Sequence, residues 1–556
     1  MPLVNMTIKQ LADHHTKMNL QREHFVNYFS MLLKTRKLGA QWLAQHPEEI
    51  TDFQGYENIY NEFRSNMATG GFYRFVSNSE KFRDILKDWG DDDIFTEQRM
   101  SGCNPMVLRR VTNNSCETDV GLKWSELIKV LNPNYNWEAA IQAAMNGRIS
   151  LEEAIKDGYV YVLRYEIFDD MISFPDFSDN RPGRSMWPAK SPVALFAVNK
   201  ERRLRPVAIQ IDHKPDSPVF SPVDGDSWML AKMVVQATDY AHSQMIEHLL
   251  KIHLFSEPFC VVLHRQLSSK HPLNVVLKYS CRGVMATNTL GAPQLITPGT
   301  FMDKLGAFGN KGTVLLLERG YKAMNWNDGD FRLDIKKRGI DDKKRLPYFP
   351  YRDDSELLFR VIRSMVKKYV QIYYRRNRDV IMDKELQAFM NELSAKGTGP
   401  DGGHGQVKDF PKKLNTRKEV ADMVTRLIWL MSVKHAAVDF PMGEYGAFTP
   451  LTPTKIYNDS RIPPGTFSVF NFPNVNVSVA QIQVAMNVGT YHYDTLFDYY
   501  EQLTDSRASE VVRRYFNILK NDINLILKKR NGKRFDKGHL TYPYFQHEWL
   551  PNGIQT

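Results

Sequence analysis

The chain has 556 residues, of which 42% are hydrophobic and 12% aromatic, so it can build a large core and does not have the composition of a disordered protein. Its longest apolar runs, residues 259–263 and 312–317, are far shorter than the roughly 18 residues that cross a bilayer, and a soluble protein is expected. The net charge of +10 favours anionic partners, but the basic residues are mixed with acidic ones and accompany no recognition motif, which argues against nucleic acid.

Helical periodicity dominates the chain in sequence order. Apolar residues recur at helical spacing over residues 25–43 and 82–89, and no long run of strands is indicated at the start. The apolar runs VALFAV (193–198) and PVAIQI (206–211) predict strands of a small sheet within residues 186–222. Five later segments are predicted to be helices: 228–255, 356–374, 383–393, 418–438 and 509–530.

These elements predict a mainly α protein with a small β-sheet insertion. We expect one domain over residues 1–556, with a helical N-terminal part (1–185) and a core (186–556), because no repeat and no Pro- or Ser-rich linker divides the chain. The Gly-rich segment 396–405, KGTGPDGGHG, is predicted to be a flexible loop. It would serve as a lid or, more commonly, as a solvated connector.

The cysteines and the N-terminus bear on the compartment. Cys103, Cys116, Cys260 and Cys281 are too few and too irregularly spaced for a disulfide framework or a zinc site. The N-terminus lacks the basic start, apolar block and cleavage site of a secretory signal. We therefore expect a reducing, cytoplasmic location.

Two apolar segments carry histidines at informative spacings. His248 and His253 lie five residues apart, which places them about 140° apart on a regular α-helix, whereas one π-type turn brings them together. His435 and Asp439 lie four residues apart and share a helix face. Imidazole and carboxylate groups together suit non-haem iron, manganese or zinc. A lone histidine on an apolar helix is more often an ordinary core residue, so the spacing alone leaves both interpretations open.

The sequence around these residues resembles the lipoxygenase family. HLLKIH (248–253) and the following LFSEPFCVVLHRQLSSKHPLNVVLKY are similar to the family's first metal-ligand helix and its downstream signature, and HAAVDF (435–440) is similar to the second. Further similar segments occur in order from residue 186 to the terminal LPNGIQT, while the N-terminal third resembles the family loosely. The resemblance implies a single-domain, bacterial-type member without the N-terminal β-sandwich of animal and plant lipoxygenases, because the helical start leaves no room for one.

The resemblance also implies a metal site with one non-haem iron per chain, manganese being the alternative metal. Its ligand positions correspond to His248, His253, His435, Asp439 and the α-carboxylate of Thr556. Two positions depart from the family, which usually ends in Ile or Val and has Asn, His or Ser in place of Asp439. A coordinating Asp439 would favour ferric iron and lower its oxidising power, whereas an outer position, hydrogen-bonded to water, would not.

Four more residues receive roles from the resemblance. Gln244 matches a glutamine that links the surroundings of the metal to the substrate cavity, and Leu295 and Ile482 match residues that clamp the substrate's pentadiene. Gly291 occupies the position where members giving R hydroperoxides have Gly and those giving S products have Ala. Each of the four is also an ordinary helix or core residue when taken singly.

The implied function is dioxygenation of polyunsaturated fatty acids by O2 to chiral hydroperoxides, predicted to be of the R type. Isomerisation of fatty-acid hydroperoxides to epoxyalcohols or ketones is the alternative that Asp439 keeps open, and a non-catalytic lipid-binding relative is a third. The basic residues are expected to form an ordinary solvated face. If they mediate peripheral membrane contact instead, helices of the N-terminal third are the expected site.

Overall fold

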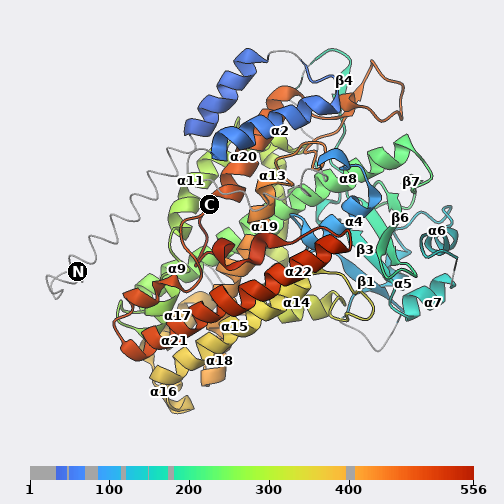
Figure 1. Ribbon diagram of the computed structural model, residues 1–556. Helices are drawn as coiled ribbons and strands as arrows, with labels where there is room; N and C mark the ends of the chain where they lie inside the picture. The colour runs from blue at the N-terminus through green and yellow to red at the C-terminus, as the bar shows by residue number, and fades with distance from the viewer. Residues whose placement is uncertain are drawn as a thin grey trace.

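The computed structural model describes residues 33–46, 49–68, 86–113, 120–147, 149–172, 179, 181–395 and 407–556. Helices make up most of the molecule, and a small sheet lies on one side, at the right of Figure 1. The prediction of a mainly α protein with a small sheet is confirmed. The Gly-rich segment 396–405 and Cys116 lie outside the described residues, as do parts of the helices predicted at 25–43 and 82–89.

The main sheet has six strands in the order β2-β1-β3-β5-β6-β7. The strands are β1 (Arg109–Thr112), β2 (Leu122–Lys123), β3 (Val160–Arg164), β5 (Val193–Val198), β6 (Leu204–Gln210) and β7 (Val219–Phe220). The apolar runs at 193–198 and 206–211 belong to β5 and β6, which pair antiparallel with Leu195 opposite Ala208. Every residue of β5 is buried, as its continuous apolar sequence predicts.

The N-terminal part, residues 1–185, was predicted to be helical, and it also contributes three strands of this sheet, β1, β2 and β3. β1 has four residues and β2 has two, which is too short for a visible alternation of apolar and polar side chains. β3 lies inside the sheet and its first four residues are all buried, so it shows no alternation either. The sheet is therefore larger than the segment 186–222 predicted.

Side chains of β3 point alternately into two separate cores. Val160 and Val162 belong to a small cluster with α6 (Trp137–Ala144), which covers one face of the sheet. Tyr161 and Leu163 belong to the large core that the main helices share. Because neighbouring strand residues face opposite sides, the sheet joins the small α5–α7 layer to the main helical body.

Two long helices at the centre of the molecule change pitch along their length. The first runs from α8 (Asp226–Ala241) through the π-helical η3 (His242–Leu254) into α9 (Phe255–Gln266). The second runs from α18 (Arg417–Trp429) through the π-helical η5 (Leu430–Lys434) into α19 (His435–Asp439). A capping box between Thr416 and Glu419 begins the second. The helices predicted at 228–255 and 418–438 thus exist, each with a wider turn inside it.

The remaining helices surround this centre, and α15 packs against both α18 and α21. They are α2 (Phe53–Ala68), α4 (Asp92–Ser101), α5 (Trp124–Leu127), α7 (Leu151–Lys156), α10 (Pro272–Leu277), α11 (Val284–Leu295), α12 (Phe301–Leu305), α13 (Gly309–Ala323), α14 (Phe331–Lys337), α15 (Pro350–Tyr373), α16 (Asn377–Ile381), α17 (Lys384–Ser394), α20 (Val475–Thr490), α21 (Ser506–Asn517), η9 (Ile518–Ile523) and α22 (Asn524–Asp536). A two-stranded sheet joins β4 (Arg184–Met186) to β8 (Tyr457–Asp459). Among the described residues, no helix combines the length and the apolar character needed to cross a bilayer.

Cys260 of α9 and Cys281 form a disulfide, while Cys103 is a buried free thiol. One bridge is not the disulfide framework that the sequence argued against, but the sequence did not predict this pairing. The two residues are 21 positions apart, and only the return of the chain after α10 brings their Cα atoms to 5.3 Å. The reducing, cytoplasmic location was expected from the cysteines and from the N-terminus. The cysteines no longer support it, and it stays a prediction.

Candidate metal centre

The π-helical segment η3 places two histidines on one side of the same helix. His248 and His253 have their ring centroids 4.7 Å apart, and their Nε2 atoms are separated by 3.1 Å. A regular α-helix would turn these side chains away from each other, whereas the wider π turn accommodates one residue more. The predicted π-type turn is confirmed.

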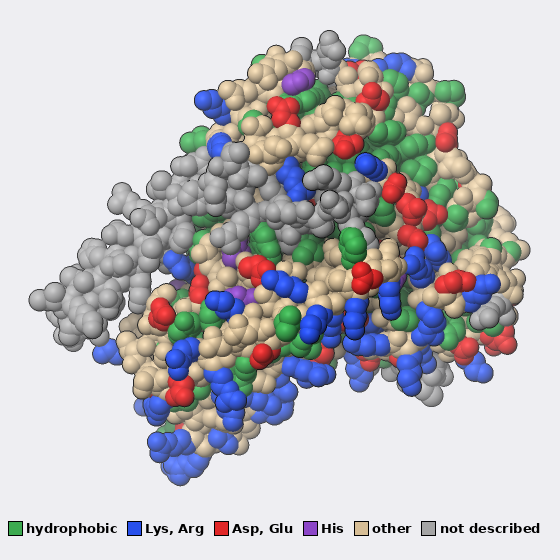
Figure 2. All heavy atoms as spheres, viewed as in Figure 1, with side chains coloured by type: hydrophobic (Ala, Val, Ile, Leu, Met, Phe, Trp, Pro, Cys, Tyr) green, Lys and Arg blue, Asp and Glu red, His purple; other side chains and the backbone are tan. Residues whose placement is uncertain are grey.

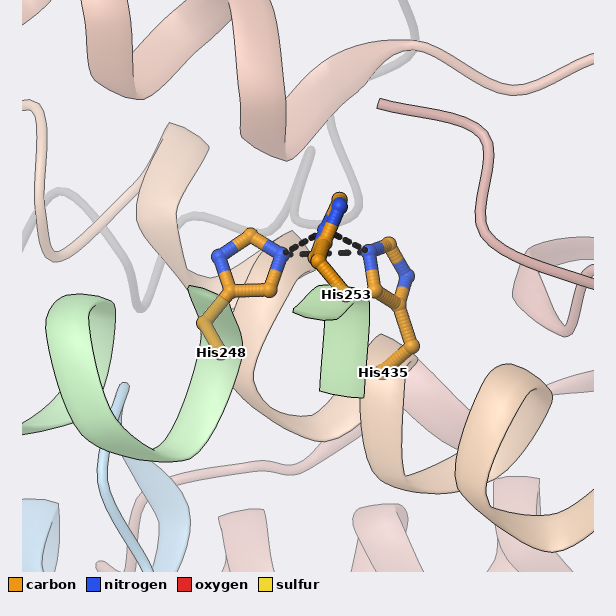
Figure 3. A group of neighbouring side chains, drawn as sticks. All are labelled: His248, His253 and His435. Atoms are coloured by element: carbon orange, nitrogen blue, oxygen red, sulfur yellow. Dashed lines mark hydrogen bonds between the residues drawn. The ribbon is translucent and has the colours of Figure 1, made fainter. Parts of the chain in front are cut away.

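His435 completes the group from the second central helix. It begins α19 directly after the π-helical η5, and its Nε2 lies 3.1 Å from that of His248 and 3.3 Å from that of His253. Figure 3 shows the three rings pointing toward one another, two from the first helix and one from the second. All three side chains are buried.

Gln244 sets the protonation of the first ring. Its amide nitrogen donates to Ser243 Oγ (3.1 Å) and to the carbonyl of Val438 (3.2 Å), so its Oε1 faces His248 Nδ1 at 2.9 Å. His248 therefore donates from Nδ1–H and turns the lone pair of Nε2 toward the other histidines. Gln244 lies one turn before His248, and its predicted role as a link between the surroundings of the metal and the substrate cavity stays a prediction.

Asn288 sets the protonation of the second ring. Its amide nitrogen donates to Glu257 Oε2 (2.7 Å) and to the carbonyl of His253 (3.1 Å), which leaves its Oδ1 to accept from His253 Nδ1 at 3.1 Å. The sequence did not identify Asn288 as part of the site. The signal was weak, because Asn288 lies in a polar run, ATNT, where other side chains have similar chemistry.

The buried histidines are held neutral. Burial lowers the pKa of His253 to about 4, against a smaller opposite effect of Asn288, and burial together with the neighbouring histidines lowers the pKa of His248 well below its usual value. The two Nε2 lone pairs of these rings face each other at 3.1 Å and cannot hydrogen-bond to each other. A bound cation can accept both lone pairs. The three Nε2 atoms are close enough together that each can lie about 2.1 Å from a single ion. The donor set fits a first-row transition metal.

Asp439 lies beside this group on α19. Its Oδ1 is 3.7 Å from His248 Nε2 and has no hydrogen-bond partner among the described residues, while Oδ2 is 3.2 Å from the hydroxyl of Thr556. Burial raises the pKa of this carboxyl well above its usual value. The Thr556 hydroxyl also lies 2.9 Å from the carbonyl of Val488, so the departure from Ile or Val at this position leaves no unsatisfied donor.

A largely apolar cavity opens onto the histidines. Gln244, His248, His253 and Thr556 line one part of it, and α11 contributes Gly291 and Leu295. A Cβ added to Gly291 would meet only the side chain of Leu295, at 3.9 Å, which is ordinary van der Waals contact. The cavity thus has room for one more methyl group at this position.

Ile482 is not among the residues that line this cavity, so the structure does not support the prediction that it clamps the substrate. It is buried in the core on α20, and the residues of α20 that line the cavity are Val484 and Val488. Two residues of a helix separated by two positions lie about 200° apart around the axis, so Ile482 and Val484 face opposite sides. The resemblance did not predict which face of α20 Ile482 occupies, because sequence similarity in a divergent segment does not define the face.

A buried ion cluster joins the two central helices next to the histidines. Glu247 precedes His248, and Lys434 precedes His435. The Glu247 carboxylate lies 3.2 Å from Lys434 Nζ and 2.5 Å from Lys251 Nζ. Burial alone would raise the pKa of Glu247, but the two ammonium groups outweigh it and hold the pKa well below its usual range. Sequence reasoning missed this cluster, because nothing local in the sequence pairs residues 187 positions apart.

Comparison with known families decides what kind of protein holds this centre. The family model described as Lipoxygenase matches residues 3–465. The chain belongs to the lipoxygenase family. The match includes most of the N-terminal part of the chain, where the sequence itself showed only a loose resemblance.

Individual relatives are distant and longer than this chain. The chain is 28% identical over 551 residues to an allene oxide synthase-lipoxygenase protein of Plexaura homomalla, covering 91% of this chain and 49% of that one. It is 29% identical to a linoleate 9/13-lipoxygenase of Pseudomonas aeruginosa, covering 69% and 55%. A crystal structure of coral 8R-lipoxygenase superposes with a TM-score of 0.78 and 26% identity, covering 96% of this chain and 75% of that one. The chain spans about half the length of these curated relatives.

Proposed function

We propose that this chain is an iron lipoxygenase that adds dioxygen to polyunsaturated fatty acids and releases hydroperoxides. The observation that carries the proposal is the convergence of three histidines at the wall of an apolar cavity. Gln244 and Asn288 orient the rings of His248 and His253 so that the Nε2 lone pairs of both face His435. When bound, iron supplies the one-electron chemistry that such an oxygenation requires. Manganese is the alternative metal.

The protein's own part in this reaction is to bind, orient and exclude water. The apolar lining accepts a hydrocarbon chain, and the branched side chains of Leu295 and Val484 lie in that lining. The buried position of the histidines keeps bulk water from them. The hydrogen bonds to Gln244 and Asn288 hold two imidazoles in one tautomer and one orientation.

We infer that His248, His253 and His435 bind the metal directly, and that the α-carboxylate of Thr556 is a fourth ligand. Thr556 lies against Asp439 and lines the same cavity, which supports this assignment. Asp439 Oδ1 is available either to the metal or to a water bound to it. Alanine at any of the three histidines should abolish metal retention. A His253→Ala variant that keeps its full iron content and rate would overturn the assignment.

Metal analysis of the purified protein, followed by absorbance of conjugated dienes, tests the proposed function. We expect about one iron per chain and a rise in diene absorbance on adding linoleate or arachidonate, with matching uptake of oxygen. Protein that contains iron and forms no diene from either acid contradicts the proposal. The Asp439→Asn variant then reports whether the negative charge matters, since unchanged metal content and rate would show that the charge of Asp439 has no effect on the centre.

Hydroperoxide isomerisation is the second candidate, and the buried Asp439 carboxylate beside the histidines is the observation that favours it. A carboxylate near the metal lowers its oxidising power, which disfavours hydrogen removal from an unoxidised fatty acid. A relative of the chain, 26% identical and covering 71% of it, is hydroperoxide isomerase ALOXE3 of Homo sapiens. Consumption of a fatty-acid hydroperoxide without oxygen uptake, together with no diene formed from linoleate, would place this reaction first.

A further inference from the structure

Two stretches that pack against each other carry all the excess positive charge of the chain. Residues 350–384 contain α15 and α16, and residues 506–537 contain α21, η9 and α22. Together they hold 19 basic and 8 acidic residues, a net charge of +11, whereas the whole chain has +10. Because α15 packs against α21 and η9, these charges gather on one side of the molecule. Figure 2 shows Lys and Arg side chains crowded along its lower part, over these helices.

The basic side chains of these stretches are mostly exposed. We call the following set the basic face: Arg360, Lys367, Lys368, Arg375, Arg376, Arg378, Lys384, Arg507, Arg513, Arg514, Lys520, Lys528, Lys529, Lys533 and Lys537. The exposed acidic residues in the same two stretches are Glu510, Asp522 and Asp536. The charge on this surface is therefore far from balanced.

Few members of the basic face are neutralised by the protein itself. Within the described part of the chain, ion pairs to a carboxylate involve four of them: Arg360 with Glu356, Arg376 with Asp379, Arg507 with Asp505, and Lys528 with Glu548. The other members repel one another across a shared surface. An anionic partner relieves that repulsion, and such a surface attracts it over a distance of about one Debye length.

Exposed apolar side chains lie among these charges. Leu525 is 53% exposed and Ile526 39% exposed on α22, and Ile381 and Met382 are 52% and 62% exposed at the end of α16. Leu525, Lys529 and Lys533 follow one another at four-residue intervals and share one face of α22. Lysines that flank exposed aliphatic side chains on a helix are typical of contact with a lipid interface.

We propose that the basic face binds the surface of a membrane that contains anionic phospholipids. The lysines and arginines contact the headgroups, and Leu525 and Ile526 reach the boundary of the acyl chains. A nucleic acid or an acidic protein segment would use the charges and leave these aliphatic side chains without a role. The site differs from the N-terminal third, which the sequence named as the place of any membrane contact, and membrane binding by this face does not depend on the proposed activity.

Vesicle co-sedimentation of the metal-loaded protein tests this surface. We expect binding to vesicles of phosphatidylcholine with phosphatidylserine, weak binding to phosphatidylcholine alone, and release by salt. The variant Lys529→Glu/Lys533→Glu/Lys537→Glu should lower the affinity for the anionic vesicles at least about tenfold. A matched variant with the same charge change on the exposed Lys129, Lys156 and Lys200 should bind like the wild type.

Two further variants and one control keep the test decisive. Lys367→Glu/Lys368→Glu on α15 should weaken binding in the same way, and it replaces the α22 variant if circular dichroism shows that variant to be misfolded. Leu525→Ser/Ile526→Ser should weaken binding several-fold, whereas Val314→Ser on α13, 52% exposed, should not.

Three results would overturn the proposal. The first is equal binding to neutral and anionic vesicles, and the second is an equal loss of binding in the matched lysine variant. The third is wild-type vesicle binding by Leu525→Ser/Ile526→Ser combined with displacement by double-stranded DNA, which would identify the surface as a general polyanion site.

Discussion

At the scale of single residues, Gly291 is where one methyl group should change the product. Its absent Cβ leaves space on the cavity wall next to Leu295, where we expect oxygen to approach a substrate radical. We expect the wild type to form mainly R hydroperoxides. Gly291→Ala should shift both position and configuration toward S, because about 1.4 kcal/mol in barrier height changes the product ratio tenfold. Chiral chromatography of the reduced products measures this, and a wild-type product that is overwhelmingly S would defeat the idea.

Asn288 should matter for metal binding, although it lies 35 residues after His253 and the sequence does not show that the two meet. Asn288→Leu removes the acceptor of His253 Nδ1–H, frees the ring to change tautomer, and should weaken metal affinity about 10- to 100-fold. Competition with a chelator measures the affinity. The exposed Thr289 on the same helix is the control, and Thr289→Val should keep wild-type affinity. Equal affinities in all three proteins would show that Asn288 does not orient the ligand.

At the scale of elements, the buried ion cluster sets how the two central helices meet. Glu247→Gln leaves the ammonium groups of Lys251 and Lys434 without their carboxylate and should cost about 3–5 kcal/mol in free energy of unfolding. Adding Lys434→Met removes one of the uncompensated charges, so the double variant should be more stable than Glu247→Gln alone. Urea unfolding of both single variants and the double variant gives the coupling energy, and iron content shows whether the histidines stay aligned.

An exposed ion pair provides the comparison for this double-mutant cycle. Glu318 and Lys322 on α13 are 2.6 Å apart and more than half exposed, so their coupling should be below about 0.5 kcal/mol. If the buried pair couples no more strongly than this one, or if Glu247→Gln unfolds like the wild type, the cluster does not hold the helices together.

At the scale of the whole molecule, a loop near residue 494 helps to hold the last residues of the chain beside the three histidines. Asp494 Oδ1 accepts from the backbone N–H of Asn552 (3.0 Å) and from the side-chain amide of Gln555. The N–H of Tyr493 in turn donates to Gln555 Oε1 at 3.0 Å. These bonds position Thr556 beside Asp439.

This loop predicts a dependence of stability on pH. Burial, and next the charge of Asp498, raise the pKa of Asp494 to about 6. A carboxyl whose folded pKa is raised binds its proton more tightly in the folded state. Its stabilising contribution is therefore complete below the unfolded pKa near 4 and lost as pH rises through 6. The loss should amount to about 3 kcal/mol in free energy of unfolding.

Asp494→Asn tests this dependence, because it keeps the Oδ1 acceptor and removes the titration. Relative to the wild type, the variant should gain stability between pH 4.5 and pH 7.5, as measured by urea unfolding at both values. A difference between the two proteins that does not change with pH would show that Asp494 does not titrate in this range.

The sequence by itself determined the features that depend on local spacing. Helical periodicity predicted the two central helices, and continuous apolar runs predicted β5 and β6. The five-residue interval between His248 and His253 predicted a π-type turn, because the angle between two side chains on one helix follows from their spacing. Resemblance in short segments then led to the lipoxygenase family, which the family comparison confirmed.

The tertiary structure alone decided which distant residues meet. Asn288 orients His253 from 35 residues away, Lys434 meets Glu247 across two helices, and Cys260 pairs with Cys281. β1, β2 and β3 join the sheet through strand pairing that their short sequences do not predict. Ile482 is not among the residues that line the cavity. The physical reason is the same throughout. Such contacts depend on how whole elements pack against one another, and the spacing of residues along one element carries no record of its neighbour.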